Sequence, residues 1–212
     1  MTGMDVALTI LVCALVLFAI GASLSWRATR LDNLHARVDV TLATLQAQLA
    51  ARAASAVDLA AGGLLDPATA VLVADAATRA RTALRRPSAG DPISVWSDRP
   101  VRPVGPPAQT ALTRALHSAF DDPDDVAELA TAEDATEVLD DLLESCRRVE
   151  LARRFHNDAV ELVRARRRAP VVRVFRLAGH ARVPDPVVFD DSVPDGLLSA
   201  LPPAPAGSAL PL

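Results

Sequence analysis

Lysine and tyrosine are missing from this sequence, and the other aromatic residues are scarce. All 22 basic side chains are therefore arginines, and the rings are confined to five phenylalanines and two tryptophans. A core with so few rings must be built from leucine, valine and alanine, which suits helices packed side by side. The composition therefore predicts an all-α protein.

Residues that usually carry catalysis are also sparse. The chain has two cysteines, Cys13 and Cys146, and four scattered histidines. We expect Cys146 to act as a small buried hydrophobe, with no disulfide to Cys13. The sequence has no glycine-rich phosphate loop, serine nucleophile elbow or cysteine–histidine metal signature. It therefore predicts no catalytic residue, no cofactor and no metal ion.

Charge is absent from one long stretch near the N-terminus. The 21 residues 6–26 carry no charged side chain. As a helix they would be about 31 Å long, enough to cross the hydrocarbon core of a bilayer. A cleaved signal peptide fits less well, because residues 1–5 contain no basic side chain and the apolar stretch is too long. The sequence thus predicts a transmembrane helix.

The flanking charges predict its orientation. Residues 1–5 contain one acid and no base, whereas Arg27, Arg30 and Arg37 follow the stretch. Under the positive-inside rule the arginine side stays in the cytoplasm. We therefore expect a single-pass protein of the plasma membrane, with its N-terminus outside the cell and its C-terminus in the cytoplasm.

After the anchor, apolar residues recur every three or four positions, as on one face of a helix. Residues 27–61 contain no proline or glycine, so this helix is expected to continue from the membrane span and to stop at Gly62-Gly63. Asp66-Pro67 is typical of a helix start. Asp121–Asp125 is interpreted as a break and cap, because proline lies inside it and the glycine of a calcium loop is missing. Further helices are expected at residues 67–86, 108–120, 124–131 and 133–168.

Proline marks two segments outside these helices. Residues 87–107 contain six prolines and predict an extended connection. Residues 191–212 contain five prolines and few charges, and we expect them to be disordered. The expected plan is a membrane helix at 6–26, a helical bundle over 27–190 and a disordered tail.

The two longest predicted helices, 27–61 and 133–168, are similar in length, and such helices usually pack antiparallel in a bundle. The last helix then runs back toward the membrane and places an arginine cluster beside the anchor. We expect this cluster to bind anionic lipid at the inner membrane surface. Its members are Arg164, Arg166, Arg167, Arg168, Arg173 and Arg176.

Two other interpretations of the arginines are open. Residues 121–144 contain eleven acids and no base, so the arginines could simply complement an acidic face of a neighbouring helix. Arginine clusters also bind nucleic acid, but the net charge of −4 and the lack of an aromatic platform argue against it. We therefore expect membrane lipid as a partner, and no nucleic acid.

The segment LARRFHNDAV, residues 151–160, resembles the LemA family of bacterial membrane proteins. The family pattern is Ala-Arg-Arg-aromatic, then Asn two residues later and Val three beyond. The matching residues here are Arg153, Arg154, Phe155, Asn157 and Val160. The family's later proline and its terminal aromatic–acidic pair correspond to Pro170 and Phe189-Asp190. The first long helix is similar in register at Leu34, Val38-Asp39, Gln48-Leu49 and Arg52. The resemblance implies an outward N-terminus, one membrane helix and a cytoplasmic helical bundle, but no reaction.

Two roles are open for the motif residues. Arg153 and Asn157 lie four positions apart and so share a helix face, and Arg154 and Asp158 are spaced for an ion pair. Arg153 and Asn157 are expected to form a polar lock with Asp39 or Gln48 of the first long helix, or else a docking surface for a partner.

The sequence as a whole predicts a membrane-anchored, non-catalytic scaffold or adaptor. Its expected partners are lipid and either another membrane protein or a copy of itself. The alternative is an enzyme or small-ligand receptor with a site between the bundle helices, which needs convergent polar groups in a pocket.

Overall fold

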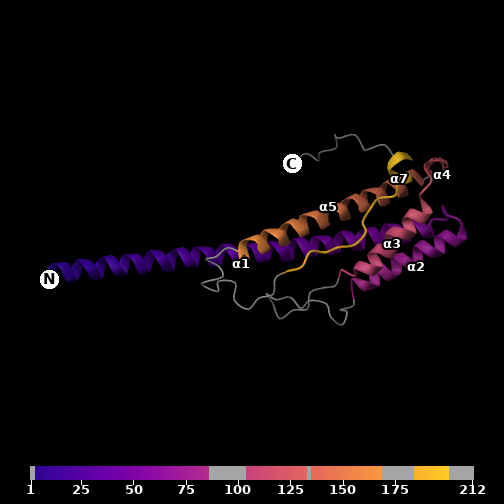
Figure 1. Cartoon of the computed structure of the whole chain (residues 1–212). Coiled ribbons are helices and arrows are strands. Elements are labelled where there is room, and N and C mark those ends of the chain that lie inside the picture. Colours follow the sequence, from indigo (N-terminus) through magenta and orange to yellow (C-terminus); the bar gives the residue numbers. More distant parts are fainter. Residues whose placement is uncertain (1–2, 86–103, 133–134, 169–183, 201–212) are drawn as a thin grey trace. The chain divides into compact units, whose positions relative to one another are not determined.

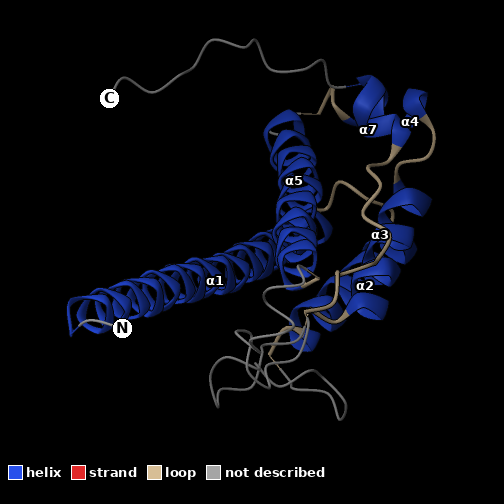
Figure 2. Cartoon of the chain, turned by 60° about the vertical axis from the view of Figure 1, so that its left-hand side comes forward, coloured by secondary structure: helices blue, strands red, loops and turns tan. Residues whose placement is uncertain are grey.

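The computed structural model describes residues 3–85, 104–132, 135–168 and 184–200, and all regular elements in these ranges are helices (Figure 1, Figure 2). The prediction of an all-α fold is therefore confirmed. Most of the predicted extended connection, the arginines Arg173 and Arg176, and residues 201–212 lie outside the described residues.

The first helix, α1 (Gly3–Ala61), is 59 residues long and continues from the apolar stretch into the amphipathic one, as predicted. It stops where Gly62 N donates to the carbonyl oxygens of Asp58 and Leu59, and Gly63 follows with a φ of 72°. Glycine favours this left-handed backbone, which explains the predicted stop. Over the parts of the helices that are described, none is both long enough and apolar enough to cross a membrane.

Aspartate caps start two later helices, as predicted. The Asp66 side chain accepts hydrogen bonds from the backbone N–H groups of Ala68 and Thr69 at the start of α2 (Pro67–Ala83). Asp122 caps α4 (Pro123–Leu129) by accepting from Asp124 N at 2.9 Å. The second long helix is α5 (Ala135–Arg167).

The helix α3 (Pro106–Ala119) starts two residues earlier than expected. Two prolines assigned to the extended connection, Pro106 and Pro107, form its first turn, where a missing N–H breaks no helical hydrogen bond. Gly105 precedes them with a φ of 63°, and a Cβ there would lie 2.6 Å from Ala83 Cβ. Glycine therefore permits this tight entry into the helix.

The chain forms two compact units, which are described separately. Unit 1 comprises Met1–Val40 and Asp158–Pro186, and unit 2 comprises Thr41–Asn157 and Val187–Leu212. Both long helices, α1 and α5, therefore contribute a part to each unit.

In unit 2, α1 and α5 pack antiparallel (Figure 1). Leu45 and Leu49 of α1 share a buried cluster with Val149 of α5. Further along α1, Leu59 belongs to a second cluster with Leu139, which comes earlier in α5. The helices α2 and α3 lie side by side and extend this second cluster with Val73, Ala77, Leu112 and Leu116.

Among the residues that the structure describes, unit 1 has a much smaller core. Val38 of α1 is buried with Ala159, Val160 and Val163 of α5, and Leu34 packs against them. Nearer the N-terminus, residues 11–19 are all exposed, including Phe18 at 76%. Because nine successive positions cover every face of a helix, this part of α1 presents apolar surface all round.

The prediction of a disordered tail is wrong for residues 191–200. These residues are part of unit 2 and include a short helix, α7 (Asp195–Ala200), beside α4. Leu197 is fully buried in the cluster that contains Phe120. Gly196 allows this close approach, since a Cβ there would lie 2.3 Å from the Phe120 carbonyl oxygen. The proline content of the tail predicted disorder, but residues 191–200 are held in place by tertiary contacts, which the local sequence does not show.

Candidate functional site

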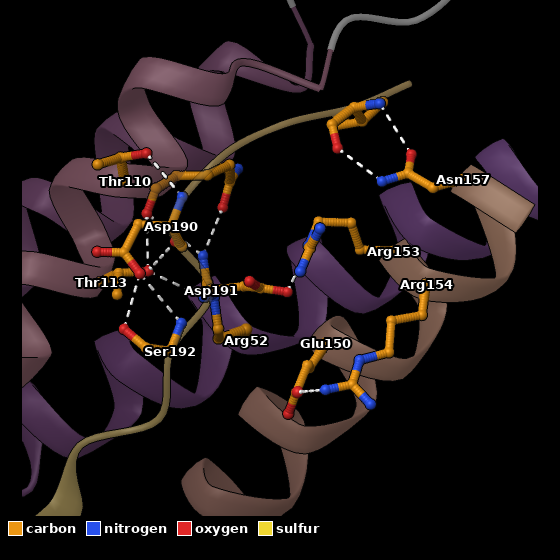
Figure 3. A network of polar contacts seen from close by, with 12 residues as sticks. Arg52, Thr110, Thr113, Glu150, Arg153, Arg154, Asn157, Asp190, Asp191 and Ser192 are labelled. Carbon is orange, nitrogen blue, oxygen red and sulfur yellow. Dashed lines mark hydrogen bonds and ion pairs between the residues drawn. The ribbon is translucent and has the colours of Figure 1, made fainter. Parts of the chain in front are cut away.

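The family-like motif of α5 faces an extended segment from late in the chain. We call residues 187–192 the strap; it has no helical or strand structure and lies in unit 2 together with α5 up to Asn157. Figure 3 shows polar side chains directed at the strap from two sides, with Arg153 and Asn157 opposite Thr110 and Thr113.

Asn157 binds the strap backbone with both ends of its side-chain amide. Its Nδ2 donates to Val187 O at 3.0 Å, and its Oδ1 accepts from Val187 N at 2.9 Å. This pairing satisfies both backbone groups of one extended residue, as a neighbouring strand would. Asn157 therefore recognises an extended backbone at this position, independently of the side chain there.

Arg153 binds both a carboxylate and a ring of the strap. Its Nε donates to Asp191 Oδ2 at 2.6 Å, and its guanidinium lies 5.9 Å from the centroid of the Phe189 ring. Phe189 is buried in the apolar cluster of Leu45 and Val149. A mostly buried, charge-assisted hydrogen bond of this kind is stronger than an exposed ion pair.

The helix α3 holds the middle of the strap by its backbone as well. Thr113 Oγ1 donates to Asp190 O at 2.6 Å, and Thr110 Oγ1 accepts from Asp190 N at 3.2 Å. The Ser192 hydroxyl, and after it the Ser192 backbone N–H, donate to the Asp190 carboxylate and hold the pKa of Asp190 below its usual value. His117 Nε2 lies 3.0 Å from Ser192 Oγ and so adds a contact at the end of the strap.

Behind Thr113, α1 contributes a buried arginine, Arg52, which is 1% exposed. Its Nη1 donates to Thr113 Oγ1 at 3.3 Å and its Nη2 to Gln109 Oε1 at 3.0 Å, whereas its Nε has no hydrogen-bond partner within the described chain. Burial lowers the pKa of Arg52, and nearby Cys146, Asp191 and Asp190 oppose this effect. The strap carboxylates therefore help to balance a buried positive charge.

The predicted polar lock between the motif and the first long helix is not among the contacts that the described residues make. Arg153 and Asn157 bind strap residues, in place of the expected Asp39 or Gln48 of α1. The spacing of the two motif residues along α5 predicted that they act together. It could not identify the strap, because the strap returns to α5 through tertiary contacts alone.

The other motif residues do not bind the strap in the contacts described. Arg154 pairs with Glu150 one turn earlier on α5, and not with Asp158 as the spacing suggested. Phe155 is 55% exposed, and Val160 is part of the small core of unit 1.

The described arginines of the predicted cluster differ in their contacts within unit 1. Arg164 donates to Pro184 O at 2.9 Å and pairs with Asp185 at 2.6 Å, so it holds the chain that precedes the strap. Burial lowers the pKa of Arg167. Arg166 and Arg168 are exposed and are the described members best placed to meet a charged surface.

Sequence reasoning did not identify Arg52, Thr110 or Thr113 as parts of this network. Arg52 carried a signal, since it lies three residues after Leu49 and four before Ala56, on the apolar face of its helix. A charged residue on such a face needs polar partners in the core. The threonines carried no comparable signal, because their helix has threonine and alanine on several faces.

Comparisons of the chain with protein-family models, curated proteins and solved structures gave no match. The resemblance to the LemA family therefore stays a prediction. Within the described ranges, no group of three or more His, Cys, Asp or Glu side chains could hold a metal ion. In the contacts described, the site holds an extended, acidic segment of the same chain.

Proposed function

We propose that the chain is a membrane-anchored, non-catalytic helical scaffold whose folded part lies in the cytoplasm. The contrast along α1 carries this proposal. Residues 11–19 expose apolar side chains on every face, whereas Leu45, Leu49 and Leu59 of the same helix are fully buried. A helix that is apolar all round is typical of a membrane span or of a helix buried in protein. Lipid would supply the missing cover for the uncharged residues 6–26.

The flanking residues support the orientation. Trp26 is 62% exposed at the end of the uncharged stretch, where an amphipathic ring suits the headgroup layer. Arg27, Arg30 and Arg37 follow it and favour the cytoplasmic side. The resemblance to the LemA family implies the same orientation.

The same proposal gives Arg166 and Arg168 a lipid contact. In unit 1, the cluster containing Val163 packs against Leu34, which lies eight residues, or about 12 Å of helix, beyond Trp26. The exposed arginines follow Val163 by less than two turns of α5. Each would contribute on the order of 1 kcal/mol of attraction to an anionic leaflet.

Membrane insertion is tested with the full-length chain in native membranes. We expect it to stay in the membrane pellet at alkaline carbonate pH, as integral proteins do, and to pass into the supernatant when Leu15 and Phe18 are both replaced by Arg, since a charge in a span costs about 3 kcal/mol. Release of the unaltered chain by carbonate would reject the anchor. A Val71→Arg and Leu72→Arg variant, altered at exposed apolar positions of α2, is the matched control and should remain in the pellet.

The lipid contact is tested by hydrogen exchange of the full-length chain in nanodiscs. The last turn of α5 should exchange more slowly in anionic than in neutral nanodiscs, and the difference should vanish in high salt. Arg166→Glu with Arg168→Glu should abolish the difference. Arg81→Glu with Arg85→Glu, at exposed positions in unit 2, should leave it intact. If the last turn of α5 exchanges equally slowly in anionic and in neutral nanodiscs, the arginines do not bind anionic lipid.

A further inference from the structure

The strap is held in the way that proteins hold a peptide ligand. Its extended backbone is bound at two residues by side chains from opposite sides: Val187 by Asn157 of α5, and Asp190 by Thr110 and Thr113 of α3. Side-chain bonds to both the N–H and the C=O of an extended residue provide affinity without requiring a particular side chain.

Specificity in this groove comes from one apolar slot and two arginines. The Phe189 ring occupies the slot beside Leu45 and Val149. Arg153 binds Asp191 directly at 2.6 Å. Buried Arg52 is hydrogen-bonded to Thr113, and the nearby carboxylates of Asp190 and Asp191 oppose the effect of burial on its pKa, so its charge favours an acid at both positions. The ligand that fits is therefore an extended segment in which an aromatic residue is followed by two acids.

The contacts do not depend on which molecule supplies the strap. Residues 169–183, between the end of α5 and Pro184, could span up to about 50 Å if extended. A strap from another copy would make the same bonds in the same groove. A strap of the same chain competes at a fixed effective concentration, whereas a strap from another copy competes at the local concentration of the chain. Exchange of an identical segment is a low-cost route to a dimer.

We propose that the groove between α3 and α5 is a peptide-binding site that also accepts the strap of a second copy of the chain. The strap of the same chain and that of a neighbour compete for one groove. Local crowding or weakening of the intramolecular contact shifts the balance toward exchange. This proposal does not depend on the membrane anchor, since all its contacts lie in unit 2.

A charge reversal split between two copies tests the exchange. One full-length chain carries Arg153→Asp and the other Asp191→Arg, so that each has two like charges within its own groove. Exchange between the two chains restores two opposite-charge pairs. The two chains are co-expressed with different affinity tags and purified in detergent. The complementary pair should co-purify at least about tenfold more than either variant with itself, which corresponds to 1.4 kcal/mol or more.

The double variant in one chain is the control, because its reversed pair can close within the same molecule. It should fold with the helicity of the unaltered chain and co-purify with itself no more than the unaltered chain does. If the double variant folds but the complementary pair is recovered no better than the like pairs, the strap acts only within its own chain and the proposal fails.

A second measurement keeps the proposal testable if the charge variants unfold. With Cys13 and Cys146 replaced by Ala, one chain carries Asn157→Cys and the other Val187→Cys, positions whose side-chain and backbone atoms are 3.0 Å apart. Mild oxidation of the mixture should give a disulfide between the two different chains, identified by mass spectrometry of the linked peptides. Absence of this cross-linked peptide from the folded, oxidised mixture would overturn the exchange.

Discussion

Unit 1 and unit 2 share the two long helices, yet different contacts hold each unit together. Unit 2 buries apolar residues from α1, α2, α3, α5 and α7 and adds a polar network around the strap. Where its side chains are described, unit 1 has four buried hydrophobic residues and exposes large apolar side chains such as Phe18. One helix therefore uses its apolar residues in opposite ways. Unit 2 is stabilised by its own contacts, whereas the exposed apolar side chains of unit 1 are those for which we propose a cover of lipid.

The strongest expected contrast is between two leucines of α1. Leu49→Ala in unit 2 removes a fully buried side chain and should lower the free energy of unfolding by about 2–5 kcal/mol. Leu15→Ala in unit 1 removes a side chain that is 61% exposed and should change it by less than about 0.5 kcal/mol. Denaturant unfolding of the full-length chain in detergent, followed by circular dichroism, measures both. Equal losses would remove the distinction between the units.

Two neighbouring arginines of α5 test how much the strap contact stabilises unit 2. Arg153→Ala leaves Asp191 mostly buried without its charged partner and should cost about 2 kcal/mol. Arg154→Ala breaks an exposed pair with Glu150 and should cost no more than about 0.5 kcal/mol. The same unfolding experiment compares them, and a larger loss for Arg154 would show that the strap contact stabilises little.

Acid should weaken the strap through Asp190. Because the pKa of Asp190 is lower in the folded chain than when unfolded, its contribution is present at neutral pH and is lost as pH falls through the folded pKa. That window lies below about pH 4, the ordinary aspartate value. Asp190→Asn should lower stability at pH 7 and flatten its dependence on pH below about 4. Urea titrations across this range test it; an unchanged slope would contradict the role given to Asp190.

The smallest expected effect concerns the cap of α2. Asp66 accepts two backbone hydrogen bonds, and Asp66→Ala should cost about 1 kcal/mol. Asp75→Ala, which removes an exposed ion pair with Arg79 on the same helix, should cost about half of that or less. Thermal melting of the two variants ranks them, and the reverse order would argue that the cap is not needed once unit 2 has packed.

The parts of the fold that the sequence predicted are those with local causes. Asp66-Pro67, Asp122-Pro123 and Gly62-Gly63 act within one helical turn, so the helix ends they predicted agree with the structure to within about two residues. Pro106 and Pro107 were misassigned because proline fits the first turn of a helix as well as a loop.

The parts that were missed have causes distant in the sequence. The strap and α7 are short, and the strap is held by residues 30 or more positions away, such as Asn157 and Arg153. The spacing of Arg153 and Asn157 showed that they share a face, but no periodicity could show what lies opposite. Arg52 was the one residue of the network that the pattern of α1 could have revealed.

The most direct test of the membrane anchor uses the chain's own thiol. In a Cys146→Ala variant, Cys13 is the sole cysteine, and it lies exposed on α1. Native membranes, opened so that both faces are accessible, are treated with a charged maleimide. Ala61→Cys, at the exposed end of α1, serves as the control and should react. If lipid covers residues 6–26, Cys13 should react only after the membrane is dissolved in a denaturing detergent. Reaction of Cys13 in intact bilayers, at the rate of the control, would contradict the anchor.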